Sequence, residues 1–531
     1  MIKLDEVDVC IIGSGAGGGL AAKELGENGI CIVVLEAGKR FNPLHDFCGA
    51  TQRDWERALE DQREIFRVPK MDRVTVASKD THRPSVAYGV GGTTLRYLAY
   101  CPRLLPDDFS IRSHDGVGMD WPITYEELAP YYRKVEWELG VSGAGADPWF
   151  PDIEKYPNPP FEFSHTNKIV KRGCDELGIR LWPVPVARNS RPFDGRPICV
   201  QCGECEYGCM TGARSSVDVT YIPKAEATGK VQIRPECVVT RIETDANGKA
   251  KSVVYFDKNG MEHEQKAKII IVSAGTVQTP RLLLNSKSSQ HPDGLANSSG
   301  MVGRNWMQHI SLFSAAVFPD RIDSYRGFFG GAISLDRAGT NKKNSFARGW
   351  SLELNSGIRG PAQLALSVPG WGTSHKKYLH RVFGHIAGIV AVGEQLPDER
   401  NRVELDPEVV DHYGMPVPRI TFNLYDNDKL MLKAMEKNLR EIYAAAGATE
   451  ILKMRYRKGG GGHNMGTCRM GKSPKTSVCN SFCQCHDVPN LFLVDGSVFV
   501  SGGTANPALT IQALGTRAVR YLIEEGKKGY L

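Results

Sequence analysis

The chain has 531 residues, enough for one large domain or for two to three interleaved domains with a sizeable core. Its 66 Lys and Arg residues against 60 Asp and Glu leave a net charge of +6, too small and too dispersed to predict nucleic-acid binding. With 41% hydrophobic residues and no apolar run near the ~18 residues of a membrane span, the composition predicts a soluble globular protein and excludes the disordered and transmembrane classes.

The first 36 residues have the pattern of a dinucleotide-binding unit. An apolar run at 7–12 is followed by a glycine-rich turn, a helical pattern at 20–25 and a second apolar run at 31–35. Strand, glycine turn, helix and strand in this order predict the opening of a doubly wound α/β sheet.

The turn between the first strand and the helix satisfies the G-x-G-x-x-G pattern with Gly13, Gly15 and Gly18. These glycines allow the tight turn, the close approach of backbone to a pyrophosphate, and close packing of helix on strand. Glu36 ends the second strand, where its carboxylate can accept hydrogen bonds from a ribose hydroxyl. The alternative is a structural turn with a solvated Glu36, and the motif alone does not separate FAD from NAD.

The middle of the chain alternates between loops and strand patterns. Residues 140–197 are rich in Pro, Gly and aromatic residues and predict long ordered loops. Alternating patterns predict meander strands at 231–244, 251–256 and 268–272, and a longer alternating region covers 327–420. Residues 490–531 return to strand, loop and a helix beginning near Pro507, so we expect the C-terminus to rejoin the N-terminal sheet.

Five further segments follow the glycine motif in a fixed order: 88–94 (YGVGGTT), 272–280 (VSAGTVQTP), 302–305 (VGRN), 463–471 (HNMGTCRMG), and 490–496 (NLFLVDG) continuing to Asn506-Pro507. Together they resemble the glucose-methanol-choline (GMC) family of FAD-dependent oxidoreductases over most of the chain. The resemblance implies an α/β fold, α+β overall, in which a Rossmann-like FAD-binding domain carries a mainly antiparallel substrate-binding domain. We expect the FAD domain at 1–315 and 456–531, with a cysteine-cluster loop at about 186–222, and the substrate domain at 316–455.

The resemblance also implies site residues. His463 matches the catalytic base and Asn506 the second active-site position; a neutral imidazole suits removal of a hydroxyl proton, while Asn506 orients the hydroxyl without adding charge. A loop histidine and an N-cap with first-turn proline are the structural alternatives. Gly92 and Thr93 are implied near the flavin, Asp495 near the ribityl chain or pyrophosphate, and Val238 near the adenine. The implied FAD-binding set is Gly13, Gly15, Gly18, Glu36, Gly92, Thr93, Val238, Asp495, Gly496 and Pro507.

Four of the 14 cysteines, Cys199, Cys202, Cys205 and Cys209, have the spacing C-x2-C-x2-C-x3-C. This spacing is typical of bacterial ferredoxins, although Met210 stands where proline normally follows. It favours an iron-sulfur cluster, [3Fe-4S] or [4Fe-4S], over a structural zinc, because zinc sites usually pair two separated knuckles. A disulfide pair is less favoured again.

The cysteine run and the segment 184–197 before it resemble the flavoprotein subunits of bacterial FAD-dependent glucose, gluconate and fructose dehydrogenase complexes. This resemblance implies oxidation of a hydroxyl of a sugar or polyol, hydride transfer to FAD, and electron exit through the cluster to a cytochrome acceptor. In such complexes a small companion subunit carries the export signal. The N-terminus has no export signal pattern, so we expect a periplasmic location by co-export, otherwise a cytoplasmic one, and membrane contact only through partners.

Three other functions stay open: a glycoside 3-dehydrogenase, an oxygen-using GMC alcohol oxidase with a structural zinc, and an FAD-containing electron-transfer subunit without an alcohol substrate. Loops within 327–393 are expected to decide which sugar and which carbon is oxidised. Packing or a disulfide is favoured over partner contact for Cys479, Cys483 and Cys485. Small core positions are expected for Cys10, Cys31, Cys101, Cys174 and Cys237.

Overall fold

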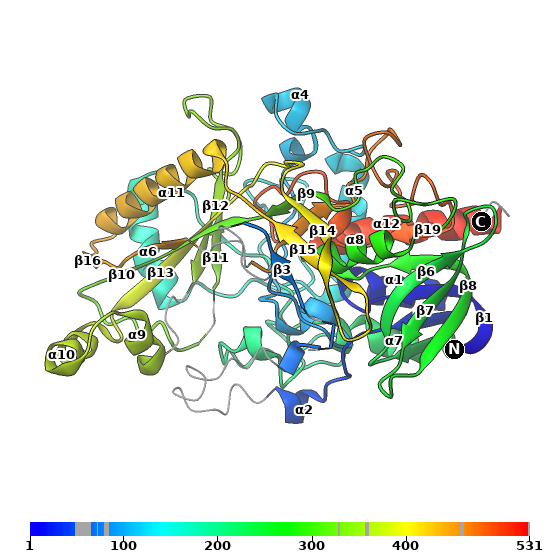
Figure 1. The fold of residues 1–531 in the computed structure, drawn as a ribbon. Coiled ribbons are helices and arrows are strands. Elements are labelled where there is room, and N and C mark those ends of the chain that lie inside the picture. Colours follow the sequence, from blue (N-terminus) through cyan, green and yellow to red (C-terminus); the bar gives the residue numbers. More distant parts are fainter. Residues whose placement is uncertain are drawn as a thin grey trace.

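The structure is a computed structural model that describes residues 1–47, 65–68, 70–71, 73–78, 84–327, 330–355, 360–456 and 461–528. Three β-sheets organise these residues, with one sheet at each end of the molecule and a smaller one between them (Figure 1). Both termini lie beside the first sheet (Figure 1). This mixed architecture confirms the predicted α/β fold class.

The first sheet has a parallel part in the order β5–β2–β1–β8, continued by the antiparallel strands β7 and β6. The last residues of β8 also pair in parallel with β19. Apolar residues form all of β2 and the last four residues of β1, and all of these residues are buried, so both faces of the parallel part are covered there. The strands are β1 (Ile2–Ile12), β2 (Ile32–Leu35), β5 (Val231–Arg234), β6 (Val238–Thr244), β7 (Ala250–Phe256), β8 (Glu262–Val272) and β19 (Leu491–Leu493).

Helices from both ends of the chain cover this first sheet. Helix α1 (Ala16–Glu27) packs against α12 (Ala508–Lys527) and α7 (Tyr221–Ala227), and α12 also packs against α5 (Tyr125–Leu139). The C-terminal segment therefore rejoins the N-terminal sheet, as the sequence predicted. The expected meander is wrong at its start: β5 pairs in parallel with β2, so only β6, β7 and β8 form antiparallel neighbours.

The second sheet is antiparallel and has the order β16–β10–β13–β12–β11–β4, with β17 paired to β10. Helices α6 (His165–Glu176) and α11 (Asp426–Ala445) pack together and against it (Figure 1). The strands are β4 (Trp182–Pro183), β10 (Ile310–Val317), β11 (Ala332–Ser334), β12 (Trp350–Asn355), β13 (Ile386–Gly393), β16 (Glu450–Ile451) and β17 (Arg455–Tyr456).

The third sheet lies between the other two and has the order β18–β9–β14–β15–β3 (Figure 1). Helix α8 (Gly275–Asn285) packs on β14, β15 and β18. The strands are β3 (Thr75–Val76), β9 (Arg304–Gln308), β14 (Arg402–Val410), β15 (Pro416–Thr421) and β18 (Asn464–Thr467). In this sheet β9 pairs with β18, and this pairing brings residues near 305 beside residues near 465.

The alternating region expected at 327–420 is not one run of strands. Helices α9 (Pro361–Ser367) and α10 (Gly372–Val382) interrupt it, and β14 and β15 belong to the third sheet. Among the described residues the remaining α-helices are α2 (Pro43–Asp46) and α4 (Ile111–Asp115). Short 3-10 turns lie at Gly92–Arg96, Pro106–Phe109, Cys205–Tyr207, Val217–Val219 and Gly496–Val498. The domain boundaries near 315 and 455 stay a prediction.

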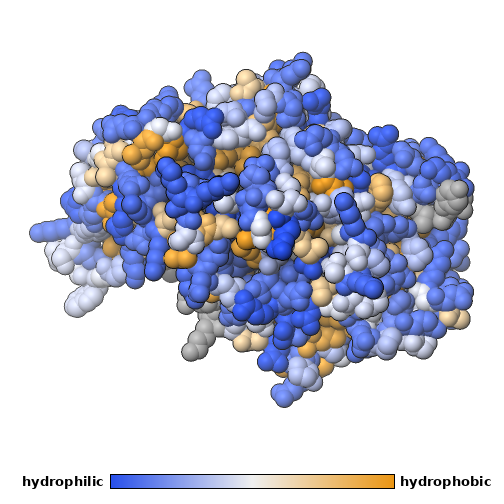
Figure 2. Space-filling view, turned by 90° about the horizontal axis from the view of Figure 1, so that it is seen from above, coloured by the Kyte–Doolittle hydropathy of each residue, from blue (hydrophilic) through white to orange (hydrophobic). Residues whose placement is uncertain are grey.

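The surface agrees with the composition. Polar residues dominate the face shown in Figure 2, with apolar residues in scattered patches. Of the helices that the structure describes, none is both long and apolar enough to cross a bilayer.

Most of the isolated cysteines are core residues, as expected: Cys10, Cys101, Cys174 and Cys237 are buried. The prediction for Cys31 is wrong. This residue is exposed because it lies just before the first residue of β2, outside the buried strand, where its N–H donates to the Asp8 carboxylate.

Candidate active site

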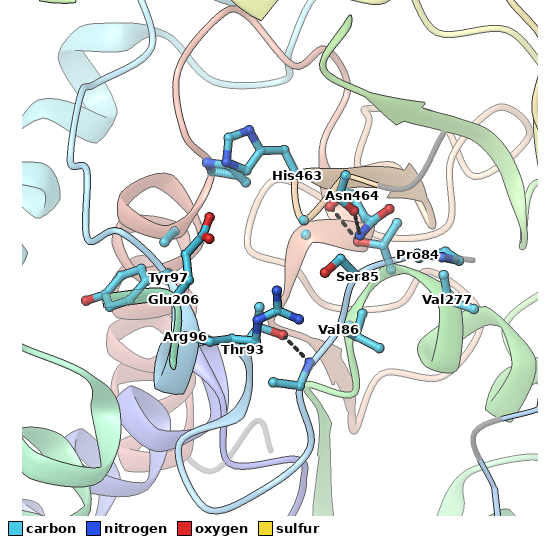
Figure 3. Close-up of a pocket in the computed structure, with 18 of the residues that line it drawn as sticks. Pro84, Ser85, Val86, Thr93, Arg96, Tyr97, Glu206, Val277, His463 and Asn464 are labelled. Carbon is cyan, nitrogen blue, oxygen red and sulfur yellow. Dashed lines mark hydrogen bonds between the residues drawn. The ribbon is translucent and has the colours of Figure 1, made fainter. Parts of the chain in front are cut away.

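A cavity of about 1300 Å³ is lined by residues of all three sheets. Every catalytic and cofactor-binding residue expected from the sequence lies on its wall except Gly18. One side of the cavity holds Arg96, Tyr97 and Glu206, and Val86 and Val277 lie across from them (Figure 3). The sequence motifs other than 302–305, although far apart in the chain, therefore converge on one space.

The glycine turn opens the N-terminus of α1 toward this cavity. A Cβ on Gly13 would lie 2.3 Å from the Ser273 carbonyl oxygen, and one on Gly18 would lie 2.0 Å from the Gly13 carbonyl oxygen. Gly18 thus packs helix on strand behind the wall. A Cβ on Gly15, the N-cap of α1, would meet only Gly92 Cα, at 3.7 Å. Free N–H groups at this helix end suit a pyrophosphate.

Glu36 connects the glycine turn to the segment 88–94. Its buried carboxylate accepts hydrogen bonds from the Ser14 N–H at 3.0 Å and hydroxyl at 2.7 Å, and from the N–H groups of Gly38 at 2.9 Å and Gly89 at 3.1 Å. Burial raises the pKa of the Glu36 carboxyl, although these hydrogen bonds oppose the shift. Glu36 lines the cavity, and its contact with a ribose stays a prediction.

Asp495, just after the end of β19, also accepts several hydrogen bonds that connect separate segments of the chain. Its carboxylate accepts hydrogen bonds from Gly275 N–H at 2.9 Å, Thr279 Oγ1 at 2.6 Å and Ser497 N–H at 2.8 Å. It therefore holds the first turn of α8 against the cavity wall. Five other residues of the expected FAD-binding set also line the wall: Gly92, Thr93, Val238, Gly496 and Pro507. A cavity of about 1300 Å³ with a helix N-terminus and buried carboxylates on its wall fits a dinucleotide of the size of FAD.

Strand pairing in the third sheet brings two histidines together. Asn464 of β18 is opposite Gln308 of β9 in an antiparallel pair, so His463 comes beside His309. Their Nδ1 atoms are 3.0 Å apart, and the rings are nearly perpendicular at 83°. Two ring nitrogens this close form a hydrogen bond, so either His309 Nδ1 or His463 Nδ1 has the hydrogen and the other atom accepts it.

Two observations assign that hydrogen to His463. His309 Nε2 is 3.4 Å from the Gly502 carbonyl oxygen, which only accepts, so His309 donates from Nε2. Burial lowers the pKa of His309 to about 4, so the ring is neutral and its Nδ1 is an acceptor. His463 therefore donates from Nδ1, and its Nε2 has the lone pair.

Asn506 faces the other ring nitrogen of the His463 side chain. Its Nδ2 is 3.2 Å from His463 Nε2, and it donates to that lone pair. The loop that carries Asn506 is held by buried hydrogen bonds from Trp121 Nε1 to Ser501 Oγ at 2.6 Å and from Ser351 Oγ to the Thr504 carbonyl at 3.2 Å. The predicted pair His463 and Asn506 is thus in hydrogen-bond contact inside the cavity.

Two further residues of this cluster were missed by the sequence analysis. His309 lies four residues after the motif at 302–305, and Glu353 is the one acidic residue of strand β12. Both are buried and line the cavity. An acidic residue between two leucines of a short strand was the signal that could have identified Glu353.

The four cysteines of the predicted cluster line a second, small hollow of about 20 Å³ together with the buried side chains of Arg188 and Arg214. Burial raises the pKa of Cys199 to about 11. Although burial opposes it, the Arg214 charge and backbone N–H together with Thr211 lower the pKa of the Cys209 thiol. Within the described ranges, no three His, Cys, Asp or Glu side chains lie close enough to hold a metal ion as they stand. The thiols face one hollow without being in coordination positions.

The other cysteine group, Cys479, Cys483 and Cys485, consists of buried free thiols in the core around the first sheet. Cys479 and Cys485 are opposite each other in a short antiparallel bridge. Of the two alternatives favoured for this group, packing is the state that the structure shows.

Comparison with known proteins agrees with this geometry. Residues 75–311 and 397–515 match the N-terminal and C-terminal models of the GMC oxidoreductase family. Formate oxidase from Aspergillus oryzae RIB40 has the same fold, with a TM-score of 0.70 over 99% of both chains at 16% sequence identity. The chain belongs to the GMC oxidoreductase family, which confirms the resemblance identified from the motifs.

Two curated relatives match almost end to end. The chain is 36% identical to 2-methyl-1,2-propanediol dehydrogenase from Mycolicibacterium austroafricanum over 98% of this chain and 95% of the relative. It is 31% identical to the fructose dehydrogenase large subunit from Gluconobacter japonicus over 98% of both. The protein is an FAD-dependent oxidoreductase that acts on CH–OH groups.

Proposed function

We propose that the protein is a dehydrogenase that oxidises a hydroxyl of a sugar or related polyol and passes the electrons through an iron-sulfur cluster to a partner acceptor. The observation that carries the first half is the His463–Asn506 contact inside the cavity. The two relatives above, one named for a diol and one for a sugar, support a substrate with several hydroxyls.

The chemistry of this chain's own residues begins at His463 Nε2. In the absence of substrate this lone pair accepts a hydrogen bond from Asn506 Nδ2 at 3.2 Å. An alcohol that enters between the two atoms donates its O–H to Nε2 and accepts from Nδ2. His463 then removes the proton while the alcohol carbon loses its hydride, and His309 holds the imidazole in the required tautomer.

FAD, when bound, supplies the acceptor for the hydride. The residues that would hold it are those of the cavity wall. The N-terminus of α1 would receive the pyrophosphate, and the glycines of the first turn and Gly92 leave room for it. The buried carboxylates of Glu36 and Asp495 fix the surrounding backbone.

The cysteine hollow supports the second half of the proposal. Four free thiols at ferredoxin-like spacing line it, and two buried arginines stand beside it to balance the negative charge of a thiolate-bound cluster. The thiols would have to move together into coordination positions and lose their protons on loading. A cluster there would supply one-electron transfer.

The hollow and the cavity are neighbours in the chain and in space. Cys205 lines the hollow, and the next residue, Glu206, lines the cavity. Arg214 joins the two walls: its guanidinium donates to the Leu95 carbonyl at 2.6 Å, the Tyr97 carbonyl at 3.0 Å and the Cys205 carbonyl. This short connection supports electron exit at the cysteine loop to a companion subunit or a cytochrome.

The test is an anaerobic absorbance titration of the purified protein with fructose, gluconate, glucose, 2-methyl-1,2-propanediol and 1-propanol, combined with iron and zinc analysis. We expect iron in the protein and bleaching of both flavin and iron-sulfur absorption by a substrate with several hydroxyls. Bleaching of the flavin in an iron-free, zinc-containing protein that consumes oxygen would replace the proposal with the oxidase. If no alcohol bleached the flavin, the result would support the alternative of an FAD-containing electron-transfer subunit without an alcohol substrate.

A further inference from the structure

Helices α9 and α10 form a hairpin at the end of the molecule opposite both termini (Figure 1). The hairpin lies between the two segments that match the family models. Its inner face is held by an apolar cluster that joins both helices to β10 and β13, made of Val317, Leu364, Val382 and Ile386. The hairpin is therefore packed on the second sheet by one face, and its opposite face is turned away from the core.

The turn of the hairpin exposes a tryptophan. Trp371 joins the two helices and is 89% exposed, and Leu366 of α9 is 63% exposed. Gly370 and Gly372 flank the tryptophan with φ angles of 137° and 77°, a conformation that residues with a Cβ rarely adopt. The turn thus holds the indole outside the apolar cluster. Its large apolar surface is left in water, and burial of that surface against a partner would be favourable.

The hairpin is also positively charged. Residues 354–393 contain no Asp or Glu, while four Lys and Arg and three His occur there. Arg381 is paired with Glu450 of β16 at 2.9 Å. Lys376 and Lys377 are exposed and form no salt bridge with any residue that the structure describes. Two uncompensated lysines of α10 therefore lie close in the chain to the exposed tryptophan.

The outer face of the hairpin consists of Leu366, Trp371, Lys376 and Lys377. We propose that this outer face binds the surface of an anionic phospholipid bilayer. The indole and the leucine would enter the headgroup region, and the lysines would lie against the lipid phosphates. A lipid surface fits better than a protein partner, because lysine is depleted in protein interfaces whereas anionic lipids attract it.

The hairpin also borders the cavity. Ser367, Val368 and Pro369 line it, and Pro369 is exposed, so one part of the cavity wall lies at the surface next to Trp371 in the chain. A hairpin bound to a bilayer would hold this part of the wall beside the headgroups. The contact is made by this chain itself, whereas the sequence analysis expected membrane contact only through partners. It does not depend on the proposed function, since it uses neither the histidines nor the cysteine loop.

The test is sedimentation of the FAD-loaded protein with vesicles, without substrate. One set of vesicles contains phosphatidylcholine alone, and the other contains phosphatidylcholine and phosphatidylglycerol in equal amounts. We expect binding to the mixed vesicles that high salt weakens, because the lysine contacts are exposed to solvent. Binding to neither set, or to both sets equally well, would overturn the proposal. Because no turnover is measured, failure of the proposed function leaves this result unaffected.

Two pairs of lysines locate the contact. The double variant Lys376→Gln with Lys377→Gln should bind the mixed vesicles about 30-fold more weakly, the usual contribution of two lysines at an anionic surface. Lys249→Gln with Lys251→Gln is the matched control, because these lysines are exposed and lie at the start of β7 in the first sheet. The control should bind like the wild type. Equal binding of the two double variants would contradict the proposal.

The tryptophan gives a second readout. Trp371→Ala should bind about 10-fold more weakly or worse, and quenching of tryptophan emission by brominated lipids should fall. Trp137→Ala is the control, since Trp137 is 44% exposed on α5. Quenching that is the same in both variants would overturn the insertion of Trp371. If no vesicle bound and Trp371→Ala dissociated a dimer in sedimentation velocity, the hairpin would bind a second copy of this chain and the lipid proposal would be wrong.

Discussion

At the scale of single residues, the proposed reaction depends on which nitrogen of His463 has the lone pair that accepts the proton. Neutral His309 accepts a hydrogen bond at Nδ1, and this contact keeps the hydrogen of His463 on its own Nδ1 atom. The Gly502 carbonyl in turn keeps the hydrogen of His309 on Nε2. His463, the proposed base, therefore needs no rearrangement of its own before an alcohol binds. The hydrogen bond from Asn506 Nδ2 to His463 Nε2 must break when the alcohol binds.

Replacing His463 by Ala should lower turnover by about 100-fold to 10,000-fold, the usual contribution of a general base. FAD should stay bound, because the residues that form the glycine turn and the Glu36 contacts are untouched. Stopped-flow reduction of the flavin by saturating substrate measures the effect, and the flavin absorbance of the purified variant is the control. Reduction at the wild-type rate would remove His463 from the role of base.

The tautomer assignment has its own consequence. Changing His309 to Leu removes the acceptor for the Nδ1 hydrogen of His463, so both tautomers become populated and kcat should fall about 10-fold. His309→Gln provides a side-chain oxygen at a similar distance and should recover most of the rate. Steady-state kinetics of the two variants decide the matter: a glutamine variant as slow as the leucine variant would contradict the assignment.

At the scale of elements, the cofactor wall depends on the close contact of α1 with β1. Gly18 is the contact point, since an added Cβ would lie 2.0 Å from the Gly13 carbonyl oxygen. The helix would have to shift away from the strand and would carry its N-terminus with it. The pyrophosphate position and the packing are therefore linked.

Gly18→Ala should destabilise the protein by about 1–3 kcal/mol, the usual cost of overpacking, and reduce the fraction of protein that retains FAD. Gly526→Ala is the matched control, because that glycine lies in the last turn of α12 with no atom within 4 Å of an added Cβ. The control should be neutral or up to about 1 kcal/mol more stable. The thermal unfolding temperature and the flavin content of both variants are the measurements. If Gly18→Ala had the same values as Gly526→Ala, the predicted link between packing and FAD binding would be contradicted.

The elements also show what the sequence could predict. The first strand, turn, helix and second strand have local patterns that fix their structure, and the GMC motifs identify the wall of the cavity. The parallel pairing of β5 with β2 was missed because alternation in a short strand does not reveal its partner. His309 and Glu353 were missed because they reach the site only through sheet pairing between distant segments.

At the scale of the whole molecule, the cavity and the cysteine hollow share a wall formed by segments from different parts of the chain. Arg214 donates to backbone carbonyls on both sides of that wall. A change at the cysteines can therefore be tested separately from a change at the base. The two half-reactions, flavin reduction and electron exit, should respond to different variants.

Cys205→Ser should leave the rate of flavin reduction by substrate unchanged and slow the transfer to an external one-electron acceptor, because it removes one thiol from the hollow. Iron content should fall in parallel. Cys31→Ser is the matched control, since Cys31 is exposed and precedes β2, outside the cysteine run. Double-mixing kinetics separate the two half-reactions. If Cys205→Ser and Cys31→Ser transfer electrons to the acceptor equally fast, the cysteine loop does not carry the electrons, and they leave the flavin by another route.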